Sequence, residues 1–408
     1  MKGDKGMSKG ILDGVRVLSI EQQVAAPFCT MMLSDQGAEV IKIERPGIGD
    51  SAREGAPVLQ NEKGEKTSGY FLRFNRNKKS FTLNTRSPEG IQVLKDLIGK
   101  SDIVLENFKP GMMEQMGLGY EEMKKINPKI VFVAISGFGK IPQYEGPFSQ
   151  RLAYDIVAQA MGGLMNLAGQ EDGPPTWLGV AVGDVVSGIY AAYAAMLGYI
   201  RAMKEGEGEF IDVSMYDCMT ALGERAHHIY SFTGNVVSRG PDKNMAPWGP
   251  FKAKDGYVAL IVPTENMWHR LCNAMDRKDL MGNEKFNSGP KRAQYRDEWE
   301  PALIEWLADK TKKEVTELLM AEGMPCGPVQ DSKDVFECPH LAKRDIFVEI
   351  DEPTVGKVKV IGSPLKMANS KTSYSRPPLL GEHTDSILKE LLNYDDDKID
   401  LLKKSKSI

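Results

Sequence analysis

The chain has 408 residues, of which 41% are hydrophobic and 26% charged, a composition typical of a soluble protein with two domains. The formal net charge is −4, from 52 Lys+Arg and 56 Asp+Glu, so there is no electrostatic case for nucleic acid or an anionic membrane as the main partner. The five cysteines are scattered and form no CxxC pair, which argues against a disulfide framework and a zinc ribbon and favours a reducing, cytoplasmic location.

The N-terminal half is organised as alternating strands and helices. Residues 1–10 are polar and lack the apolar segment of a signal peptide, so we expect a flexible leader there. Strands separated by helices of this length predict right-handed βαβ units and a parallel sheet in an α/β fold. The predicted strands cover residues 15–20, 38–44, 79–83, 102–105, 130–135 and 209–214.

Three predicted helices have recognisable ends. The first covers residues 27–36 and stops at Gly37. The second begins at Ser87-Pro88-Glu89, with Ser at the N-cap and Pro at the first helical position. The third covers residues 178–203. Its uncharged stretch, residues 185–200, is short for a membrane span and rich in Gly and Ala, which favours a helix inside a globular core.

The pattern changes after about Gly234, which indicates a second domain. Residues 252–260 predict a β-hairpin around Asp255-Gly256, and amphipathic helices follow. The expected organisation is a large domain over 11–220, a linker over 221–245, a small α+β domain over 246–345, a return linker over 346–384, and a C-terminal helical segment over 385–408 that packs on the large domain.

Several enzyme signatures are absent. The first βα turn, residues 21–26, is not Gly-rich, so the dinucleotide-binding fingerprint is missing, although Glu44 stands where such enzymes hold a ribose. Arg45 follows Glu44 and would equally suit a phosphate. No P-loop or GxSxG elbow is present. The five histidines are too few and too badly spaced for a metal site, so we expect no metal.

Carboxylates are the remaining candidates for chemistry. Asp184 follows Gly183 at the mouth of the small-residue helix. One interpretation is that Asp184 is an N-cap, because Asp is favoured there. The other is functional: a helix N-terminus keeps a carboxylate ionised, and Gly183 removes a side chain that would block a bulky ligand. The sequence leaves both open, and Asp155 is equally ambiguous.

Several segments in a fixed order resemble the family III CoA-transferases (CaiB/BaiF type), which include formyl-CoA and carnitine CoA-transferases. The resemblance extends from about Leu12 to about Leu391 and implies a Rossmann-like, CoA-binding large domain and an interlocked dimer. It rests on LDGVRVL (12–18), GAEVIKIE (37–44), LENFKPG (105–111), GVAVGD (179–184), MPCGPV (324–329) and PLLGEHTD (378–385).

The resemblance also implies the chemistry. The Asp184 carboxylate would attack an acyl-CoA to give a mixed anhydride, and the released thiolate would return to form an aspartyl-CoA thioester. An acceptor acid would then reverse the two steps. Coenzyme A is accordingly expected as a substrate and not as a tightly bound cofactor. Backbone N–H groups near Gly183 are candidates for stabilising the oxyanions.

The family's CoA contacts carry over to six positions, and two other positions depart from the family pattern. Gln115 stands in place of a basic residue, and Val24 replaces a glutamine in the first βα turn. For Arg45 and Arg86 the alternative is ordinary solvated charge. The implied CoA-binding residues are Arg45, Arg86, Asn107, Phe108, Met116 and Met215. The implied acyl pocket contains Gln23, Val24, Tyr154, Asp155, Gly183 and Trp248.

Other functions remain as alternatives. A 2-methylacyl-CoA racemase would resemble the Gly-Asp segment, but it uses a histidine where this chain has Tyr154, whose ordinary pKa of about 10 suits that role poorly. Two further alternatives are a subunit of a heteromeric CoA-transferase, paired with a related chain, and a dinucleotide dehydrogenase. The implied substrates are an acyl-CoA and a carboxylic acid. Trp248 and several methionines suggest an apolar or aromatic acyl group, or they are ordinary core. Succinyl-CoA as the donor, with an aromatic or branched acid as the acceptor, is the first substrate pair to assay.

Overall fold

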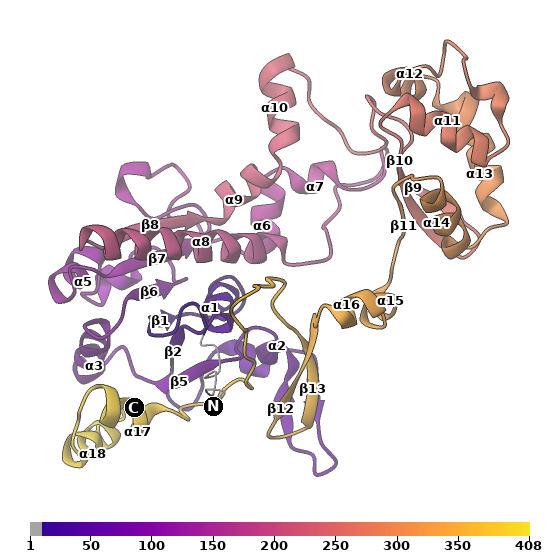
Figure 1. Cartoon of the computed structure of the whole chain (residues 1–408). Helices are drawn as coiled ribbons and strands as arrows, with labels where there is room; N and C mark the ends of the chain where they lie inside the picture. Colours follow the sequence, from indigo (N-terminus) through magenta and orange to yellow (C-terminus); the bar gives the residue numbers. More distant parts are fainter. Residues whose placement is uncertain (1–9) are drawn as a thin grey trace, which may run out of the picture. The chain divides into compact units, whose positions relative to one another are not determined.

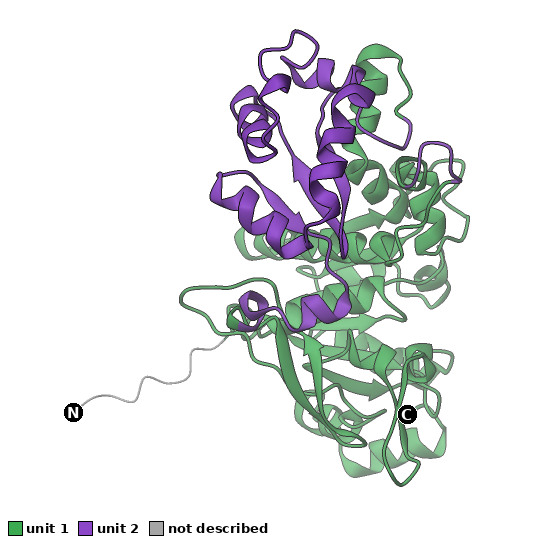
Figure 2. Cartoon of the chain, turned by 90° about the vertical axis from the view of Figure 1, so that its right-hand side faces the viewer, with its two compact units in different colours: residues 1–168, 175–237, 343–408 green, residues 169–174, 238–342 purple. Residues whose placement is uncertain are grey.

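The computed structural model describes residues 10–408, so the predicted leader lies outside the described residues except for Gly10 (Figure 1). The chain forms two compact units (Figure 2). Unit 1 contains the described residues up to Ala168 together with Pro175–Val237 and Lys343–Ile408. Unit 2 contains Gly169–Pro174 and Ser238–Ala342. Unit 2 is therefore an insertion in unit 1, and it includes a short segment that the sequence placed in the large domain.

Unit 1 is built on a six-stranded sheet in which every pair of neighbouring strands is parallel, as the sequence predicted. The order is β5 (Lys78–Thr82), β2 (Glu39–Glu44), β1 (Arg16–Ile20), β6 (Ile103–Glu106), β7 (Val131–Ser136) and β8 (Glu209–Ser214). The first strand of the chain, β1, lies between β2 and β6. The chain therefore continues on opposite sides of β1, and the strand order reverses at the carboxyl end of β1. Open α/β sheets bind ligands at such a switch point.

The strands are buried on both faces because helices cover each side of the sheet. Alternate residues point to opposite cores: Val17 lies in one hydrophobic core and Leu18 in the other. The first core contains side chains of α1 (Ala25–Asp35) and α8 (Val182–Glu205), and the second those of α3 (Pro88–Ile98) and α5 (Tyr120–Ile126).

Local signals account for several helix ends. The hydroxyl of Ser87 accepts a hydrogen bond from the N–H of Gly90 at 3.0 Å, and Pro88 opens α3, which confirms the predicted start. Gly37 has φ of 101°, a left-handed conformation that ends the α1 segment. The start of α8 differs from the prediction, because its N-cap is Ala181 and residues 178–181 are not helical. Asp184 lies in the first turn and is not the N-cap.

Helix α8 packs closely on its neighbours through glycines. A Cβ atom at Gly188 would lie 2.7 Å from the carbonyl oxygen of Ala25, and one at Gly198 would lie 2.5 Å from Cγ1 of Val131. Among the described helices, α8 alone is long and apolar enough to cross a membrane by length and composition. The contacts at Gly188 and Gly198 place one face of α8 against α1 and the sheet.

The C-terminal segment completes unit 1. It contains α17 (Thr384–Ser386), the π-helical turn η4 (Ile387–Leu391) and α18 (Asp396–Lys404). Ile387, Leu388, Ile399 and Leu402 join the core that contains α3, and the N–H of Asn84 donates to the carbonyl of Ser407 at 2.8 Å.

Both predicted linkers contain regular structure. The return linker contains an unexpected hairpin, β12 (Phe347–Glu352) with β13 (Gly356–Ile361), and the linker over 221–245 contains α10 (Glu224–Thr233). The remaining elements of unit 1 are η1 (Ser51–Glu54), β3 (Val58–Gln60), β4 (Lys66–Ser68), α2 (Gly69–Leu72), α4 (Met112–Gln115), η2 (Pro142–Tyr144), α6 (Asp155–Met161), α7 (Leu164–Leu167) and α9 (Met215–Leu222).

Unit 2 has its own core around an antiparallel sheet. The predicted hairpin is confirmed: β9 (Trp248–Ala253) pairs with β10 (Gly256–Ile261), which also pairs with β11 (Cys326–Pro328). Trp268 and Trp299 pack edge to face in this core with ring centroids 5.6 Å apart. The helices are α11 (Glu265–Ala274), η3 (Lys278–Leu280), α12 (Gly289–Gln294), α13 (Arg296–Ala308), α14 (Lys312–Ala321) and α15 (Ser332–Phe336), and α16 (Pro339–Lys343) leads back to unit 1.

Candidate active site

Asp184 lies where the first turns of α8 and α6 meet. Asp155, the first residue of α6, accepts a hydrogen bond from the N–H of Gly183 at 2.7 Å through Oδ1. Its Oδ2 accepts from Nε2 of Gln159 at 2.8 Å, and the same Nε2 also donates to the carbonyl of Val180 at 3.0 Å. Asp155 therefore supplies from another helix the cap that α8 lacks in its own sequence.

This contact bears on two expectations about Gly183. A Cβ atom there would lie 3.0 Å from Oδ1 of Asp155 and 3.4 Å from Cβ of Ala158, so the glycine lets α6 approach α8 closely. Its own N–H donates to Asp155, and the expected role of backbone N–H groups near Gly183 as oxyanion donors stays a prediction.

The ionisation of Asp184 also differs from the sequence prediction. Burial raises its pKa to about 7, and the like charge of Asp155 adds to the effect. The expected help of the helix N-terminus is thus outweighed. Burial, followed by the charge of Asp184, also raises the pKa of Tyr70, which places the phenol within electrostatic reach of this carboxylate.

An apolar cluster adjoins the carboxylate. It contains buried Val24, Met31 and Phe74, and the half-buried side chains Phe28, Tyr70 and Val185 pack against them. Val185 follows Asp184 directly, so the cluster connects the first βα turn to the start of α8. A carboxylate beside such a surface loses hydration, which is the physical cause of its raised pKa.

The first βα turn has an unusual backbone that is held by side chains. Gln23 has φ of 66°, and its N–H donates to Oδ1 of Asp50 at 3.2 Å. Its side-chain amide donates to the hydroxyl of Ser51. These bonds fix the turn that places Val24 in the apolar cluster, so the structure brings Val24 and Asp184 into the same region.

Below this turn lies a buried network of two acids and two lysines. Nζ of Lys42 is 2.8 Å from Oδ2 of Asp50, and Nζ of Lys78 is 2.8 Å from Oε1 of Glu21. The side chains of Lys42, Lys78 and Glu21 are fully buried. Burial lowers the pKa of Lys78 to about 8 although Glu21 opposes the change. The two positive and two negative charges balance, and the network fixes Asp50 beneath Gln23.

At the switch point of the sheet, a reciprocal pair of hydrogen bonds joins Asn107 to Gln22. Oδ1 of Asn107 accepts from the N–H of Gln22 at 3.0 Å, and Nδ2 of Asn107 donates to the carbonyl of Gln22 at 2.9 Å. The loops after β1 and β6 are thereby tied together at the edge where α/β sheets bind ligands.

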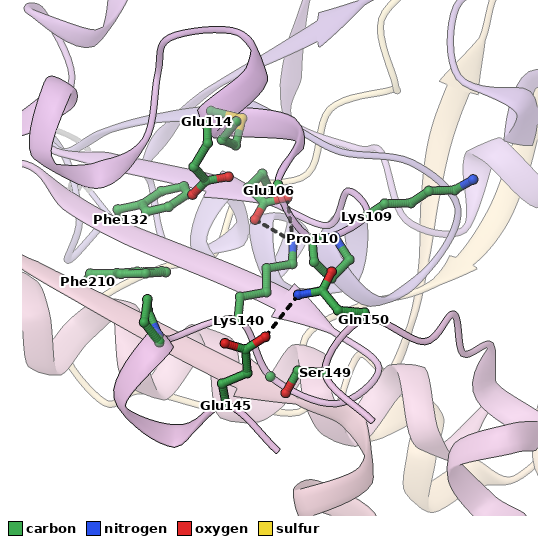
Figure 3. Close-up of a pocket in the computed structure, with 14 residues that line it drawn as sticks. Glu106, Lys109, Pro110, Glu114, Phe132, Lys140, Glu145, Ser149, Gln150 and Phe210 are labelled. Atoms are coloured by element: carbon green, nitrogen blue, oxygen red, sulfur yellow. Dashed lines mark hydrogen bonds and ion pairs between the residues drawn. The ribbon is translucent and has the colours of Figure 1, made fainter. Parts of the chain in front are cut away.

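A pocket opens beside the next loop (Figure 3). Lys140 and Glu106 point toward one another in it, with Nζ 2.7 Å from Oε1. The same Nζ donates to the carbonyl of Phe108 at 2.6 Å, and Lys109 and Pro110 line the pocket. Burial raises the pKa of Glu106 although Lys140 opposes the change. This ion pair shapes the LENFKPG turn.

The comparisons with known proteins agree along almost the whole chain. Residues 12–384 match the CoA-transferase family III. The chain belongs to this family. It is 38% identical to human succinyl-CoA:glutarate CoA-transferase, over 94% of this chain and 87% of the relative. It is 36% identical to a succinyl-CoA:mesaconate CoA-transferase of Haloarcula marismortui, over 93% of this chain and 96% of the relative. A CaiB/BaiF family protein from Brucella suis superposes with a TM-score of 0.83 at 31% identity, covering 94% and 100% of the two chains.

The protein is thus a family III CoA-transferase, and four of its implied CoA contacts lie at one edge of the sheet. Arg45 follows β2, Arg86 follows β5, and Asn107 and Phe108 follow β6, all at the carboxyl ends of parallel strands. Both arginines are exposed.

The structure does not bring the two implied methionines together. Met116 is half-buried against the core that contains α3, whereas Met215 is 5% exposed in the core that contains α1 and α8. Met215 therefore fits the alternative of an ordinary core residue in this CoA-transferase.

The residues that the resemblance assigned to an acyl pocket fall into two groups. Val24, Asp155 and Gly183 surround the start of α8, and Gln23 adjoins Val24. Tyr154 is 78% exposed, and Trp248 belongs to unit 2. Within residues 10–408, no group of three or more His, Cys, Asp or Glu side chains is arranged to hold a metal ion.

Sequence reasoning missed the aromatic segment beside Asp184. Tyr70 and Phe74 belong to α2 and the turn after it, and Arg73 lies between them. Their only sequence signal was an aromatic spacing that is equally typical of ordinary core, because nothing local indicates that these residues meet a carboxylate over a hundred residues later.

Proposed function

We propose that Asp184 is the covalent nucleophile of this CoA-transferase. The observation that carries the proposal is a half-buried carboxylate in the first turn of α8, next to an apolar cluster and with a pKa of about 7. Desolvation makes a carboxylate a stronger base and nucleophile once it is ionised, and an apolar surface disfavours competing water.

The reaction proceeds by acyl exchange without net hydrolysis. The Asp184 carboxylate attacks the acyl-CoA carbonyl, the C–S bond breaks, and an aspartyl–acyl anhydride and CoA thiolate form. The thiolate attacks the aspartyl carbonyl, which releases the donor acid and leaves an aspartyl-CoA thioester. The acceptor carboxylate attacks this thioester to give a second anhydride, and the thiolate then attacks the acceptor's carbonyl. The new acyl-CoA leaves and Asp184 is regenerated.

The donor we propose is succinyl-CoA. Support comes from the names of the human and Haloarcula relatives, both of which use succinyl-CoA. Their acceptors, glutarate and mesaconate, are dicarboxylic acids. This supports a dicarboxylic acceptor above the aromatic or branched acid suggested by Trp248.

We also propose that the protein acts in the cytoplasm as an interlocked homodimer, with a related chain as the alternative partner. All five cysteines lie in the described residues and are free. The outer face of α8 supports a second copy, because it presents an exposed apolar stripe at helical spacing. The stripe consists of Ile189, Tyr193, Leu197 and Ile200.

Borohydride trapping tests the nucleophile. The protein is incubated with succinyl-CoA and reduced, and peptide mass spectrometry is applied to the segment that contains Asp184. An aspartyl thioester becomes an alcohol at that residue. Asp184→Ala is expected to lack the label and the transfer activity, and full activity in this variant would exclude the mechanism. Exchange of the substrate α-proton with solvent deuterium, without CoA transfer, would instead indicate a racemase.

A further inference from the structure

Arg73 carries a positive charge that its surroundings do not neutralise. It is the C-cap residue of α2, and its side chain is exposed. Two other arginines of this region have acidic partners: Arg53 pairs with Glu44 at 2.7 Å, and Arg76 pairs with Asp35 at 2.6 Å. Over residues 10–408 the structure shows no ion pair for Arg73.

The guanidinium of Arg73 stacks on the wall of the apolar cluster beside Asp184. Its Cζ lies 4.6 Å from the ring centroid of Phe74 and 5.3 Å from that of Tyr70. The two rings pack edge to face 6.4 Å apart, and the cluster that contains them extends to Val185, the neighbour of Asp184. A cation and the nucleophile therefore border one apolar surface.

The cation and the nucleophile are not paired with each other. The charges of both Asp184 and Arg73 act on the phenol of Tyr70, in opposite directions. The pKa of Asp184 is nevertheless raised, by burial and by Asp155, with no lowering by Arg73. Arg73 thus remains available to another anion, while a direct pair would have lowered the pKa of Asp184.

We propose that Arg73 binds the remote carboxylate of a dicarboxylic acyl group while its thioester carbonyl faces Asp184. The inference rests on the proposed function and specifies its substrate class. A planar guanidinium binds a carboxylate through two parallel hydrogen bonds, and the rings of Tyr70 and Phe74 hold it in a fixed orientation. The methylenes between the two carboxyl groups pack on the apolar cluster. Succinyl and glutaryl groups have this pattern of charge, apolar spacer and thioester.

The test compares succinyl-CoA with butyryl-CoA, in which a methyl group replaces the remote carboxylate. In Arg73→Gln, kcat/KM for succinyl-CoA is expected to fall about 10- to 100-fold, the loss of one charged hydrogen-bonded contact. The kcat/KM for butyryl-CoA is expected to stay within about twofold, and Arg73→Lys is expected to recover part of the selectivity. Lys63→Gln, which removes an exposed cation from the turn between β3 and β4, is the matched control and is expected to change neither value.

The outcomes separate this inference from the proposed mechanism. An equal loss for both donors, or unchanged selectivity, would overturn the role of Arg73. Borohydride trapping at Asp184 is measured in parallel on the wild type. A label at Asp184 with unchanged selectivity in Arg73→Gln refutes the anchor and retains the nucleophile. Lost selectivity in Arg73→Gln without a label at Asp184 retains the anchor and refutes the nucleophile.

Discussion

Oδ1 of Asp155 accepts the N–H of Gly183 at 2.7 Å, and this one hydrogen bond links the capping of α8 to the ionisation of Asp184. The bond satisfies a backbone donor that a helix N-terminus leaves free. It also fixes a second carboxylate close enough to raise the pKa of Asp184. The helix start is therefore stabilised at a cost to the ionised form of Asp184.

The pH dependence of the wild-type enzyme follows from this arrangement. The proposed nucleophilic attack requires the ionised form of Asp184, whose pKa is raised to about 7. We expect kcat/KM for the acyl-CoA donor to rise tenfold per pH unit below about 7 and to level off above it. Steady-state rates between about pH 5 and 9 measure the profile. A flat profile down to pH 5 would show that the free enzyme holds Asp184 ionised.

Replacing Asp155 by Asn separates its two roles. The amide oxygen of Asn still accepts from Gly183, while the charge that raises the pKa of Asp184 disappears. The acidic limb of the pH profile is expected to move to lower pH. Asp155→Ala also loses the cap and should cost about 1 kcal/mol of unfolding free energy in urea. An unshifted limb in Asp155→Asn would mean that burial alone sets the pKa.

The free energy of unfolding should depend on pH through the ionisation of Asp184. Its folded pKa lies above the ordinary value of 3.8, so the folded state holds the proton more tightly and stability falls as pH rises from about 4 to 7. Asp184→Asn removes this dependence. The variant is expected to be more stable than the wild type at pH 8, and its advantage should shrink by about 1–3 kcal/mol at pH 5. Urea unfolding at both pH values measures the difference, which a constant advantage would contradict.

Single substitutions in the buried network beneath the first βα turn should destabilise the folded protein. Lys42→Met leaves Asp50 buried without its cation and is expected to cost about 3–5 kcal/mol. Adding Asp50→Asn removes the uncompensated charge, so the double variant should lose less than the sum of the two single variants.

Lys79→Met is the control for that series. Lys79 lies on β5 and pairs with Glu39 at 2.6 Å, but its side chain is 42% exposed, so its loss should cost about 1 kcal/mol or less. Equal costs for Lys42→Met and Lys79→Met would show that burial of the network contributes little.

The parallel sheet could be predicted from the sequence because its signals are local. Strands such as Val131–Ser136 are nearly continuous runs of apolar residues. This pattern is typical of strands in a parallel sheet that is covered on both faces. The hairpin of β12 and β13 was missed although its alternating Val358 and Val360 carried a strand signal, because the neighbouring Pro- and Ser-rich segment indicated a linker.

The sequence singled out the residue on which the proposed function rests, but not the environment of that residue. Asp184 stands out through its Gly-Asp segment and the family resemblance. Its raised pKa depends on Asp155 and on the cluster around Val24 and Tyr70, which are distant in sequence. The start of α8 was missed for the same reason, since the carboxylate that caps it lies 28 residues earlier on another helix.

The insertion of unit 2 has a consequence for biosynthesis. The chain leaves unit 1 at Val237 and returns at Lys343, and Ile387 and Leu402 fill the core beneath the sheet. Domains generally fold in the order in which the ribosome delivers them. Unit 2 is synthesised whole before unit 1 is complete, so the core that contains α3 lacks part of its apolar side chains until residues 384–404 have been synthesised. A chain truncated before α17 would keep Asp184 and the loops around it, yet expose the apolar side chains that the C-terminal segment covers, which favours aggregation.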